Sequence, residues 1–408
     1  MRRRVAITGV GLTSPIGGDL DAVSDALRAG RHGVARCPEW AAVHGLQTRL
    51  VARVEDAALQ SFPRKKVRSM GRLGLLSLLA TERALDDAGL DREALRDGRH
   101  GIAYGSTHGS SEALTDFCRR LFTTDSLDGI SGSAYLKFMS HTCVANLAQY
   151  YGVRGRVVST CAACVSGSVA VGTGYELVRA GVQRVMLCGG AEEAHFVPAA
   201  VFDTMLATSR AFNDRPDESP RPFDADRDGL VVGEGAGTLV LEPLDEALAR
   251  GARVYAEVLG YGSSCDGTHV TAPDADGMRL AMELCLQDAG ITADEVDYVN
   301  AHATATEVGD HAEAAATHAV FGARVPVSST KGHTGHTLGA CGALELAFCV
   351  AMMRGGFIAP TRNLRRVDPR LAPLDHVMGA AREARLRVVM SNNFAFGGMN
   401  TSILLRAL

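Results

Sequence analysis

The sequence predicts an α/β protein in which two similar halves surround a buried layer of helices. Along its 408 residues, short apolar segments of strand length alternate with longer amphipathic or apolar segments of helical length, the pattern of layered α/β folds. Glycine is frequent where these segments meet, as tight turns between strands and helices require. The third observation is a weak internal repeat, which matches the elements of one half with those of the other.

Three pairs of segments carry the repeat, in the same order in both halves. The first pair is a helix that ends at a glycine before a strand. The second is a strand that leads through a loop into a helix of small and apolar residues, and the third is another strand. The pairs are 85–95 with 286–296, 157–181 with 325–355, and 184–190 with 387–393. The chain is therefore divided into an N-terminal half, residues 1–250, and a C-terminal half, residues 251–408.

One helix in each half has almost no polar face. Before the last turn, its only charged residue is Glu176 in the first half and Glu345 in the second. A helix that is apolar on all sides is buried, so the two helices are expected to form a central layer between two sheets. A lone buried carboxylate is costly, and Glu345 therefore needs a partner.

Composition argues against two classes of function. The formal net charge is −4, which gives no reason to expect general binding to nucleic acid or to a membrane surface. The sequence shows no apolar stretch of about 18 residues, the length that spans a bilayer, and its basic start lacks the apolar core of a signal peptide. The ten cysteines are scattered, mostly in apolar runs, which indicates buried free thiols in a reducing compartment. We expect a cytoplasmic protein.

Cys161 and Cys164 stand between a β-branched segment and a helix of small residues. Four interpretations are open: a redox pair, half of a zinc site, two buried thiols, or one nucleophile. The redox interpretation lacks the small thioredoxin-like context, and a zinc site would need a second pair of ligands. If the helix begins near Cys164, its dipole lowers the pKa of that thiol and favours a nucleophile there.

Two of the 13 histidines lie in loops rich in glycine and threonine. His302 follows a short apolar strand, and His336 precedes the second buried helix, close to the position that Cys164 holds in the repeat. A twofold relation between the halves would bring Cys164 and His336 together at facing helix ends. A single histidine is more often structural, and we interpret His333 as an ordinary loop residue.

Six motifs, in order along the chain, resemble those of the β-ketoacyl-acyl-carrier-protein synthases, the type II elongating condensing enzymes of the thiolase-like superfamily. They are RRVAITGVGLTSPIG near the start, ACVSG around Cys164, RPFDADRDGLVVGEGAG at 221–237, NAHATAT around His302, KGHTGH ending at His336, and SNNFAFGGMN at 391–400. Each motif alone is weak, whereas the six together are specific and cover essentially the whole chain. The resemblance implies a thiolase-like five-layer αβαβα sandwich.

The resemblance also implies an acyltransferase that performs a decarboxylative Claisen condensation by a ping-pong route. Cys164 would take an acyl chain from a carrier-protein thioester, and His302 and His336 would act on the malonyl thioester. Loss of CO₂ leaves an enolate, whose oxygen needs the hydrogen-bond donors that two imidazole N–H groups supply. Backbone N–H groups of Cys164 and Phe396 would hold the tetrahedral oxyanion, and the Phe396 ring would gate the acyl pocket.

The remaining site residues are also implied by the resemblance. Lys331, Asp310 and Glu313 would form an ion-pair network beside the histidines, in which the lysine orients groups rather than accepting protons. The expected substrate contacts are Thr271, Thr304, Thr306, Phe394 and His108. A monovalent-cation or hydrogen-bond site would comprise Asn300, Glu345, Ser391 and Asn392.

The resemblance implies no redox cofactor, because the pantetheine arm belongs to the acyl carrier protein. The expected partners are that carrier and a second subunit, either an identical chain or a catalytically silent one that resembles a chain-length factor. Two rival functions fit less well. A CoA-dependent thiolase would add a catalytic cysteine in the glycine-rich segment 391–400, and a silent subunit would lack Cys164 or one of the histidines.

Several positions depart from the family pattern. Ala305 stands where Gly or Ser is common, Ala395 replaces Gly, and Met399 replaces Thr. His108, in YGSTHGSS, falls where related enzymes carry a pocket residue that influences acyl length. A polar imidazole there indicates an unusual acyl chain, such as that of a polyene pathway, or alternatively an ordinary interface histidine.

Overall fold

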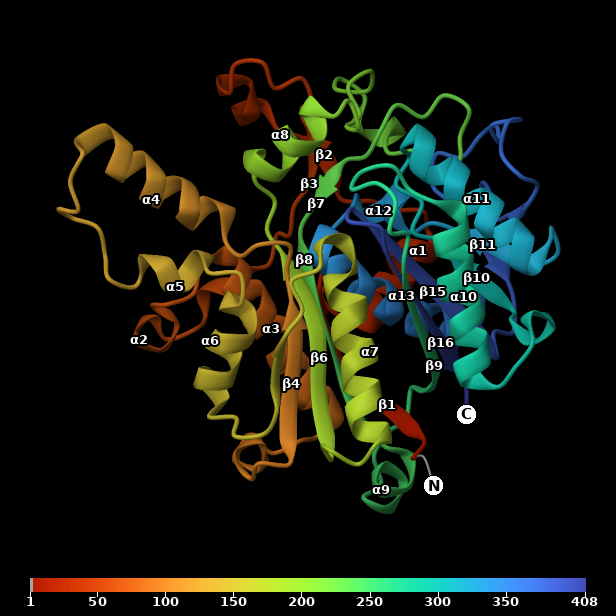
Figure 1. Cartoon of the computed structure of the whole chain (residues 1–408), viewed down its shortest axis with the longest axis horizontal. Helices are drawn as coiled ribbons and strands as arrows, with labels where there is room; N and C mark the ends of the chain where they lie inside the picture. Colours follow the sequence, from red (N-terminus) through yellow and green to blue (C-terminus); the bar gives the residue numbers. More distant parts are fainter. Residues whose placement is uncertain (1–2) are drawn as a thin grey trace.

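The computed structural model describes residues 3–408, and its main sheet consists of one block of strands from each half (Figure 1). Within these residues that sheet has 11 strands. The N-terminal block is, in spatial order, β5 (Val157–Ser159), β4 (His100–Gly105), β6 (Val185–Glu192), β8 (Gly235–Pro243) and β1 (Val5–Thr13). The C-terminal block continues with β9 (Ala256–Cys265), β16 (Met399–Arg406), β15 (Val388–Ala395), β10 (Tyr298–Asn300), β11 (Pro326–Ser328) and β13 (Asp375–His376).

Helices cover both faces of each block, which produces five layers. The outer helices are α3 (Arg72–Ala88) and α6 (Thr142–Tyr151) on the N-terminal block, and α10 (Ala275–Ala289) and α11 (Glu307–Phe321) on the C-terminal block. The middle layer is α7 (Ser166–Arg179) and α13 (Cys341–Gly355). On β8, Leu239 and Leu241 pack with the middle helices, whereas Val240 packs with α3, because side chains alternate between the two faces of a strand. The αβαβα order is therefore confirmed.

The topology confirms the repeat predicted from the sequence. Strands β5, β4, β6, β8 and β1 occur in the same order as β11, β10, β15, β16 and β9. The outer helices α3 and α10 end at Gly89 and Gly290, with φ of 61° and 68°, a conformation that glycine adopts without strain. The boundary between residues 250 and 251 stays a prediction; it falls between α9 (Leu244–Ala249) and β9.

The sequence predicts two sheets, whereas the structure joins them through one short pairing. Val5–Ile7 of β1 pair with residues 256–258 of β9, so the two blocks share hydrogen bonds at their inner edges. An open edge strand leaves N–H and C=O groups unpaired. The pairing removes one such edge from each half, and each block still has its own face against the middle helices.

The middle helices are largely buried. The stretch Leu338–Gly355, which contains α13, is long and apolar enough to span a membrane, contrary to the expectation that no such stretch exists. However, 83% of it lies inside the protein, which fits the core helix of a soluble fold. In α7, Glu176 is exposed where the helix leaves the core, so this helix is not apolar on all sides. The ten cysteines, all within the described residues, are free and mostly buried.

Other helices lie outside the five layers. α4 (Ser111–Thr124) and α5 (Ala134–Phe138) project to one side (left in Figure 1), and Ser111 is the one buried residue of α4. α8 (Phe196–Thr204) and the short α12 (Lys331–Thr334) lie close to the candidate site. The remaining elements are α1 (Leu20–Arg28), α2 (Arg64–Val67), the small sheet of β2 (Val34–Arg36), β3 (Leu50–Ala52) and β7 (Val232–Gly233), and the pair β12 (Phe357–Ile358) and β14 (Arg382–Glu383).

Candidate active site

Cys164 lies in a single 3₁₀ turn, residues Ala163–Val165, that precedes α7. The helix itself begins at Ser166, two residues later than the sequence analysis assumes. Ala163 has a positive φ of 47°, an unusual conformation for alanine. The Ser166 hydroxyl fixes the turn, because its Oγ donates to the Ala163 carbonyl (2.7 Å) and accepts from the Ala162 N–H (2.9 Å).

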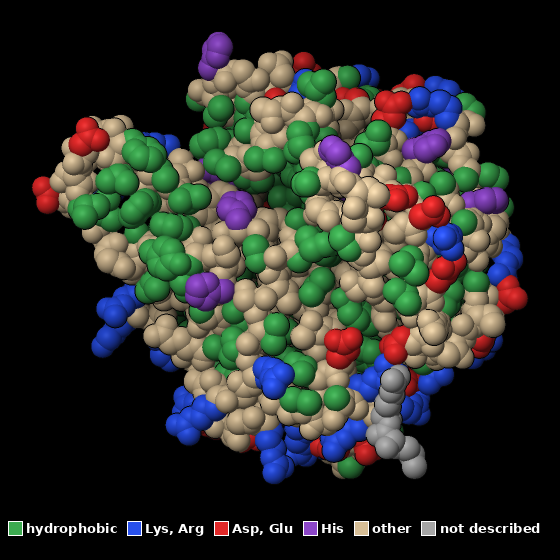
Figure 2. Space-filling model, viewed as in Figure 1, with side chains coloured by type: hydrophobic (Ala, Val, Ile, Leu, Met, Phe, Trp, Pro, Cys, Tyr) green, Lys and Arg blue, Asp and Glu red, His purple; other side chains and the backbone are tan. Residues whose placement is uncertain are grey.

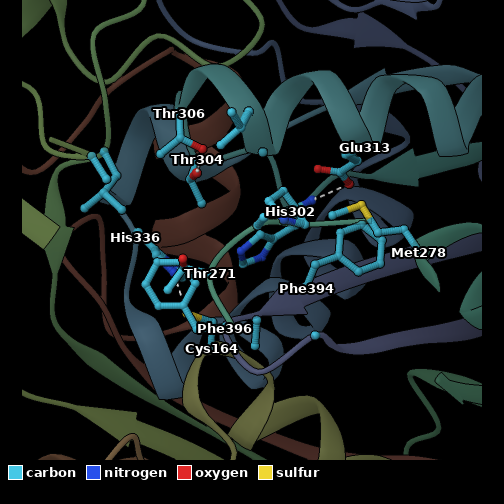
Figure 3. Close-up of a pocket in the computed structure, with 18 of the residues that line it drawn as sticks. Cys164, Thr271, Met278, His302, Thr304, Thr306, Glu313, His336, Phe394 and Phe396 are labelled. Carbon is cyan, nitrogen blue, oxygen red and sulfur yellow. Dashed lines mark hydrogen bonds between the residues drawn. The ribbon is translucent and has the colours of Figure 1, made fainter. Parts of the chain in front are cut away.

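The structure brings the three predicted reactive residues together (Figure 3). His336 Nε2 lies 3.0 Å from Cys164 Sγ. The His302 ring meets the His336 ring edge to face, with 5.0 Å between the centroids. One ligand-type atom from each of the three side chains lies within 4.8 Å of the other two. The nucleophile and both imidazoles therefore face the same small volume.

Burial keeps these three groups neutral. It raises the pKa of the Cys164 thiol to about 12, although the Lys331 ammonium opposes the shift. The prediction of a lowered thiol pKa is therefore wrong, because desolvation outweighs the helix dipole. Burial also holds the pKa of His302 and of His336 well below the usual range, and Lys331 adds to both shifts. The site at rest is an S–H group hydrogen-bonded to a neutral imidazole.

The turn that carries His336 is held by its backbone. The His336 N–H donates to the Val231 carbonyl (2.7 Å), and the His336 carbonyl accepts from the Gly233 N–H (2.9 Å). Three residues earlier, the His333 ring is fully buried, with Nδ1 2.8 Å from the Arg31 carbonyl and Nε2 3.1 Å from that of Pro360. His333 is thus a tightly packed anchor of this turn rather than an ordinary loop residue.

Two buried carboxylates hold the turn that carries His302. Glu313 accepts the backbone N–H of His302 (2.8 Å) and of Ala303 (2.6 Å), and burial raises its pKa to about 8. Asp310 accepts the N–H of Ala305 (3.1 Å) and of Phe223 (2.7 Å). Ala305 and Phe223 both have a positive φ, of 70° and 63° respectively. The carboxylates therefore bind backbone N–H groups and stabilise strained residues.

Lys331 and Glu345 form an ion pair in the protein interior. The two charged groups are in contact and 1% and 3% exposed, and Asn393 Nδ2 donates to the second Glu345 oxygen (2.7 Å). Glu345 raises the pKa of Lys331 against the effect of burial, so the lysine is charged. This pair is the partner that Glu345 was expected to need.

The four residues of the expected cation site do not fit a bound cation. Both Glu345 oxygens already face donors, one of them the Lys331 ammonium. Asn300 Nδ2 donates to Ser391 Oγ (3.2 Å), and Asn392 Oδ1 accepts from Ser402 Oγ (2.8 Å). These four residues belong to hydrogen-bond networks, and Lys331 supplies the positive charge beside Glu345.

A cavity of about 360 Å³ leads to Cys164. Its wall contains both histidines, Glu313 and the expected gate residue Phe396. It also contains four of the five expected substrate contacts, which are Thr271, Thr304, Thr306 and Phe394. His108 does not line it; the ring of His108 instead faces Ser111 Oγ (2.8 Å) and Thr107 Oγ1 (3.0 Å). This cavity therefore gives no support for His108 as a residue of the acyl pocket. The influence of His108 on the acyl chain stays a prediction.

Comparisons with known proteins identify the family of the chain. Residues 2–247 match the N-terminal domain of beta-ketoacyl synthases, and residues 255–365 match the C-terminal domain. The chain belongs to the beta-ketoacyl synthase family. A curated relative, 3-oxoacyl-[acyl-carrier-protein] synthase 1 of Haemophilus influenzae, is 36% identical over 406 residues, 99% of both chains.

Solved structures of the beta-ketoacyl synthase family superpose over the whole chain. A beta-ketoacyl synthase from Burkholderia phymatum STM815 is 48% identical with a TM-score of 0.96, and the alignment covers 100% of both chains. The ishigamide ketosynthase/chain length factor is 35% identical with a TM-score of 0.93, again over 100% of both chains. The family assignment made from the motifs is thus confirmed.

Sequence reasoning missed several residues of the site. Phe202, on α8, lines the cavity and lies 5.5 Å from the Phe396 ring. Met278, on α10, lines it behind His302 (Figure 3). Cys341 lies at the start of α13, and its thiol donates to the Cys164 carbonyl (3.2 Å). These residues belong to apolar helix faces, where their sequence looks like that of ordinary core positions.

Replacement of Ala305 by glycine is expected to raise the temperature of thermal unfolding. Alanine at φ 70° carries a cost that glycine does not, and the net gain after the entropy of the unfolded chain is about 1 kcal/mol or less. Differential scanning calorimetry should show an upward shift of about 1–2 °C. The matched control is Ala303→Gly at a position without positive φ, which should shift the midpoint downward. A downward shift for both variants would show that Ala305 is not strained.

Proposed function

We propose that the protein is a β-ketoacyl-acyl-carrier-protein synthase that extends an acyl chain by two carbons. The observation that carries this proposal is the contact of Cys164 with His336, beside His302, at the end of a threonine-lined cavity. The substrates are an acyl thioester and a malonyl thioester of an acyl carrier protein. The products are a 3-oxoacyl thioester of the carrier and CO₂.

In the first half-reaction, Cys164 Sγ attacks the carbonyl carbon of the acyl thioester. The thiol is neutral, so its proton must leave as the bond forms, and His336 Nε2 at 3.0 Å is placed to accept it. The same nitrogen then delivers the proton to the departing pantetheine sulfur. The backbone N–H groups of Cys164 and Phe396 are the proposed donors to the tetrahedral oxyanion.

In the second half-reaction, the malonyl thioester occupies the space that the first carrier arm has left. Its carboxylate departs as CO₂, and the electron pair moves to the thioester as an enolate. Neutral imidazoles at His302 and His336 donate N–H hydrogen bonds to the enolate oxygen without being acids strong enough to quench the carbanion. For His336 this requires the ring proton to pass from Nδ1 to Nε2 between the two half-reactions. The carbanion attacks the Cys164 thioester, and Cys164 leaves as a thiolate that regains a proton from solvent.

The charged residues around the site position the reacting groups. Glu313 and Asp310 fix the backbone of the His302 turn. Lys331 pairs with Glu345 and keeps positive charge close to both imidazoles. Thr271, Thr304 and Thr306 offer hydroxyl groups along the cavity wall to the amides of a pantetheine arm. The proposed steps use the carrier's pantetheine and need no redox cofactor.

We propose that the chain works as a dimer in the cytoplasm. Strand β5 is an edge of the sheet and keeps Val157 43% exposed, and α4 and α5 present large exposed side chains beside it, among them Phe122 and Tyr135. A second subunit that pairs with β5 would cover this surface. The second subunit is either an identical chain or a chain-length factor, and the likeness to the ishigamide ketosynthase/chain length factor supports the latter.

An acyl-enzyme assay tests the nucleophile. After mixing with an acyl carrier protein that bears a saturated acyl chain, the wild-type protein should gain the mass of that acyl group, and Cys164→Ala should not. Cys161→Ser is the control, because this exposed thiol donates to the Thr107 carbonyl and does not line the cavity; it should acylate like the wild type. Acylation of Cys164→Ala, or its loss in Cys161→Ser, would refute the assignment.

Decarboxylation of malonyl carrier protein tests the histidines. His302→Ala and His336→Ala should each slow CO₂ release by about a hundredfold or more, because each change removes one donor to the enolate oxygen. His311→Ala is the control, since His311 is exposed on α11 and does not line the cavity. Rates close to wild type in either alanine variant would contradict the proposed role of that histidine.

A further inference from the structure

Cys164, His302 and His336 present one thiol and two imidazoles to the same small volume, and these are groups that also bind metal ions. One ligand-type atom of each lies within 4.8 Å of the other two, and His336 Nε2 lies 3.0 Å from Cys164 Sγ. In the described part of the chain, this is the one group of three or more histidine, cysteine or acidic side chains with such spacing. Three protein ligands with a fourth position open to water are typical of accessible zinc sites.

The spacing of the three atoms is close to that of a tetrahedral zinc site. Zinc bonds of about 2.3 Å to sulfur and about 2.0–2.1 Å to nitrogen set the ligand atoms about 3.3–3.6 Å apart. The contact of Cys164 with His336, at 3.0 Å, must therefore open by about half an ångström. The widest separation in the group, at most 4.8 Å, must close by about 1.5 Å or less. Small side-chain rotations produce shifts of this size.

The chemical state of the three groups is compatible with a metal ion. Neutral imidazole is the form of histidine that binds metals. Nδ1 of His302 and of His336 is buried without a hydrogen-bond partner, so no contact in the described residues forces the ring proton onto one nitrogen. A proton on Nδ1 leaves the lone pair of Nε2 for the ion. The Cys164 thiol loses its proton when it binds, because a coordinating sulfur is a thiolate.

An ion can reach this position from solvent. Val270 and Val308 line the cavity and are 68% and 63% exposed, so the cavity is open at that end. α8 forms one side of the cavity, and Figure 2 shows hydrophobic side chains gathered over this helix and beside it. Inside, the Lys331 ammonium would repel a cation, but it is already paired with Glu345. The thiolate offsets one of the two charges of a divalent ion.

We propose that Cys164, His302 and His336 bind a zinc ion, which blocks the nucleophile reversibly. The S–H bond breaks, a sulfur–zinc bond forms, the proton leaves to water, and no electrons are transferred. A water molecule takes the fourth position on the cavity side. Sulfur and imidazole nitrogen favour Zn²⁺ over Mg²⁺, which prefers oxygen ligands. The ion is an inhibitor rather than a cofactor, because the proposed reaction needs the same sulfur for the acyl group.

Zinc binding to the metal-free protein tests the site directly. Equilibrium dialysis with metal analysis should find one more zinc ion per chain in the wild type than in Cys164→Ala. The affinity of this site should fall by about a hundredfold or more in the variant, because even an outer-shell partner contributes about ten- to a hundredfold. Cys161→Ser removes an exposed thiol that does not line the cavity. This matched control should bind zinc like the wild type.

Two further measurements show whether the ion covers the sulfur. Co²⁺ in place of zinc should give a sulfur-to-cobalt absorption band in the wild type and none in Cys164→Ala. At a free zinc concentration ten times the dissociation constant, alkylation of Cys164 by iodoacetamide should slow about tenfold, because about one thiol in eleven is free. A chelator should restore the rate, and Mg²⁺ at the same concentration should not change it. Acylation from the acyl carrier protein should be lost and restored in parallel.

Several results would overturn the proposal. Equal zinc binding by the wild type and Cys164→Ala would place the ion elsewhere, and unchanged alkylation in zinc would leave the sulfur uncovered. A loss of acylation that a chelator does not reverse would mean that zinc aggregates the protein. The binding and alkylation measurements use no substrate and are independent of the proposed function, on which only the loss of acylation rests. Absence of acylation without zinc would therefore refute the proposed function and not the metal site.

Discussion

The geometry of the site depends on how closely the two middle helices approach one another. At the start of α7, a side chain on Gly167 would lie 3.0 Å from the Ala343 nitrogen of α13. At the start of α13, a side chain on Gly342 would lie 2.5 Å from the Ser168 nitrogen of α7. The two contacts are reciprocal, as a twofold relation between the halves requires. The backbones of α7 and α13 are therefore in direct contact. The 3₁₀ turn of Cys164 lies against the corresponding turn of the other half, Leu338–Ala340.

This close packing buries the reactive groups and so decides their protonation. In a dry interior, neutral forms are favoured unless a partner charge is present, which explains why Cys164 and both histidines are neutral while Lys331, beside Glu345, is charged. Glu313 and Asp310 accept backbone N–H groups of the His302 turn, and Asp310 also lies 3.6 Å from the Arg227 guanidinium. The protein thus keeps one buried ion pair, Lys331 with Glu345, beside the reacting groups, and its positive charge helps to keep both imidazoles neutral.

Much of the fold could be predicted from sequence because the repeat is visible in short segments, as apolar patterns and glycines at equivalent places. Gly89 and Gly290 end equivalent helices, and the apolar middle helix α13 is buried as its composition predicts. The features that could not be predicted depend on contacts between residues that are far apart in the sequence. The raised pKa of Cys164 comes from burial by residues of both halves, and the pairing of Lys331 with Glu345 replaces the expected cation. His336 also lies before the position equivalent to Cys164, because the two 3₁₀ turns place Gly339 there.

Different parts of the chain position the reactive residues and form the mouth of the cavity. Cys164, His302 and His336 lie on turns that connect strands to helices in the repeated core, so the packing of the halves fixes their distances. The mouth of the cavity lies between α8, the segment between β9 and α10, and the start of α11, outside that contact. The walls of the mouth are therefore separate from the turn that positions Cys164.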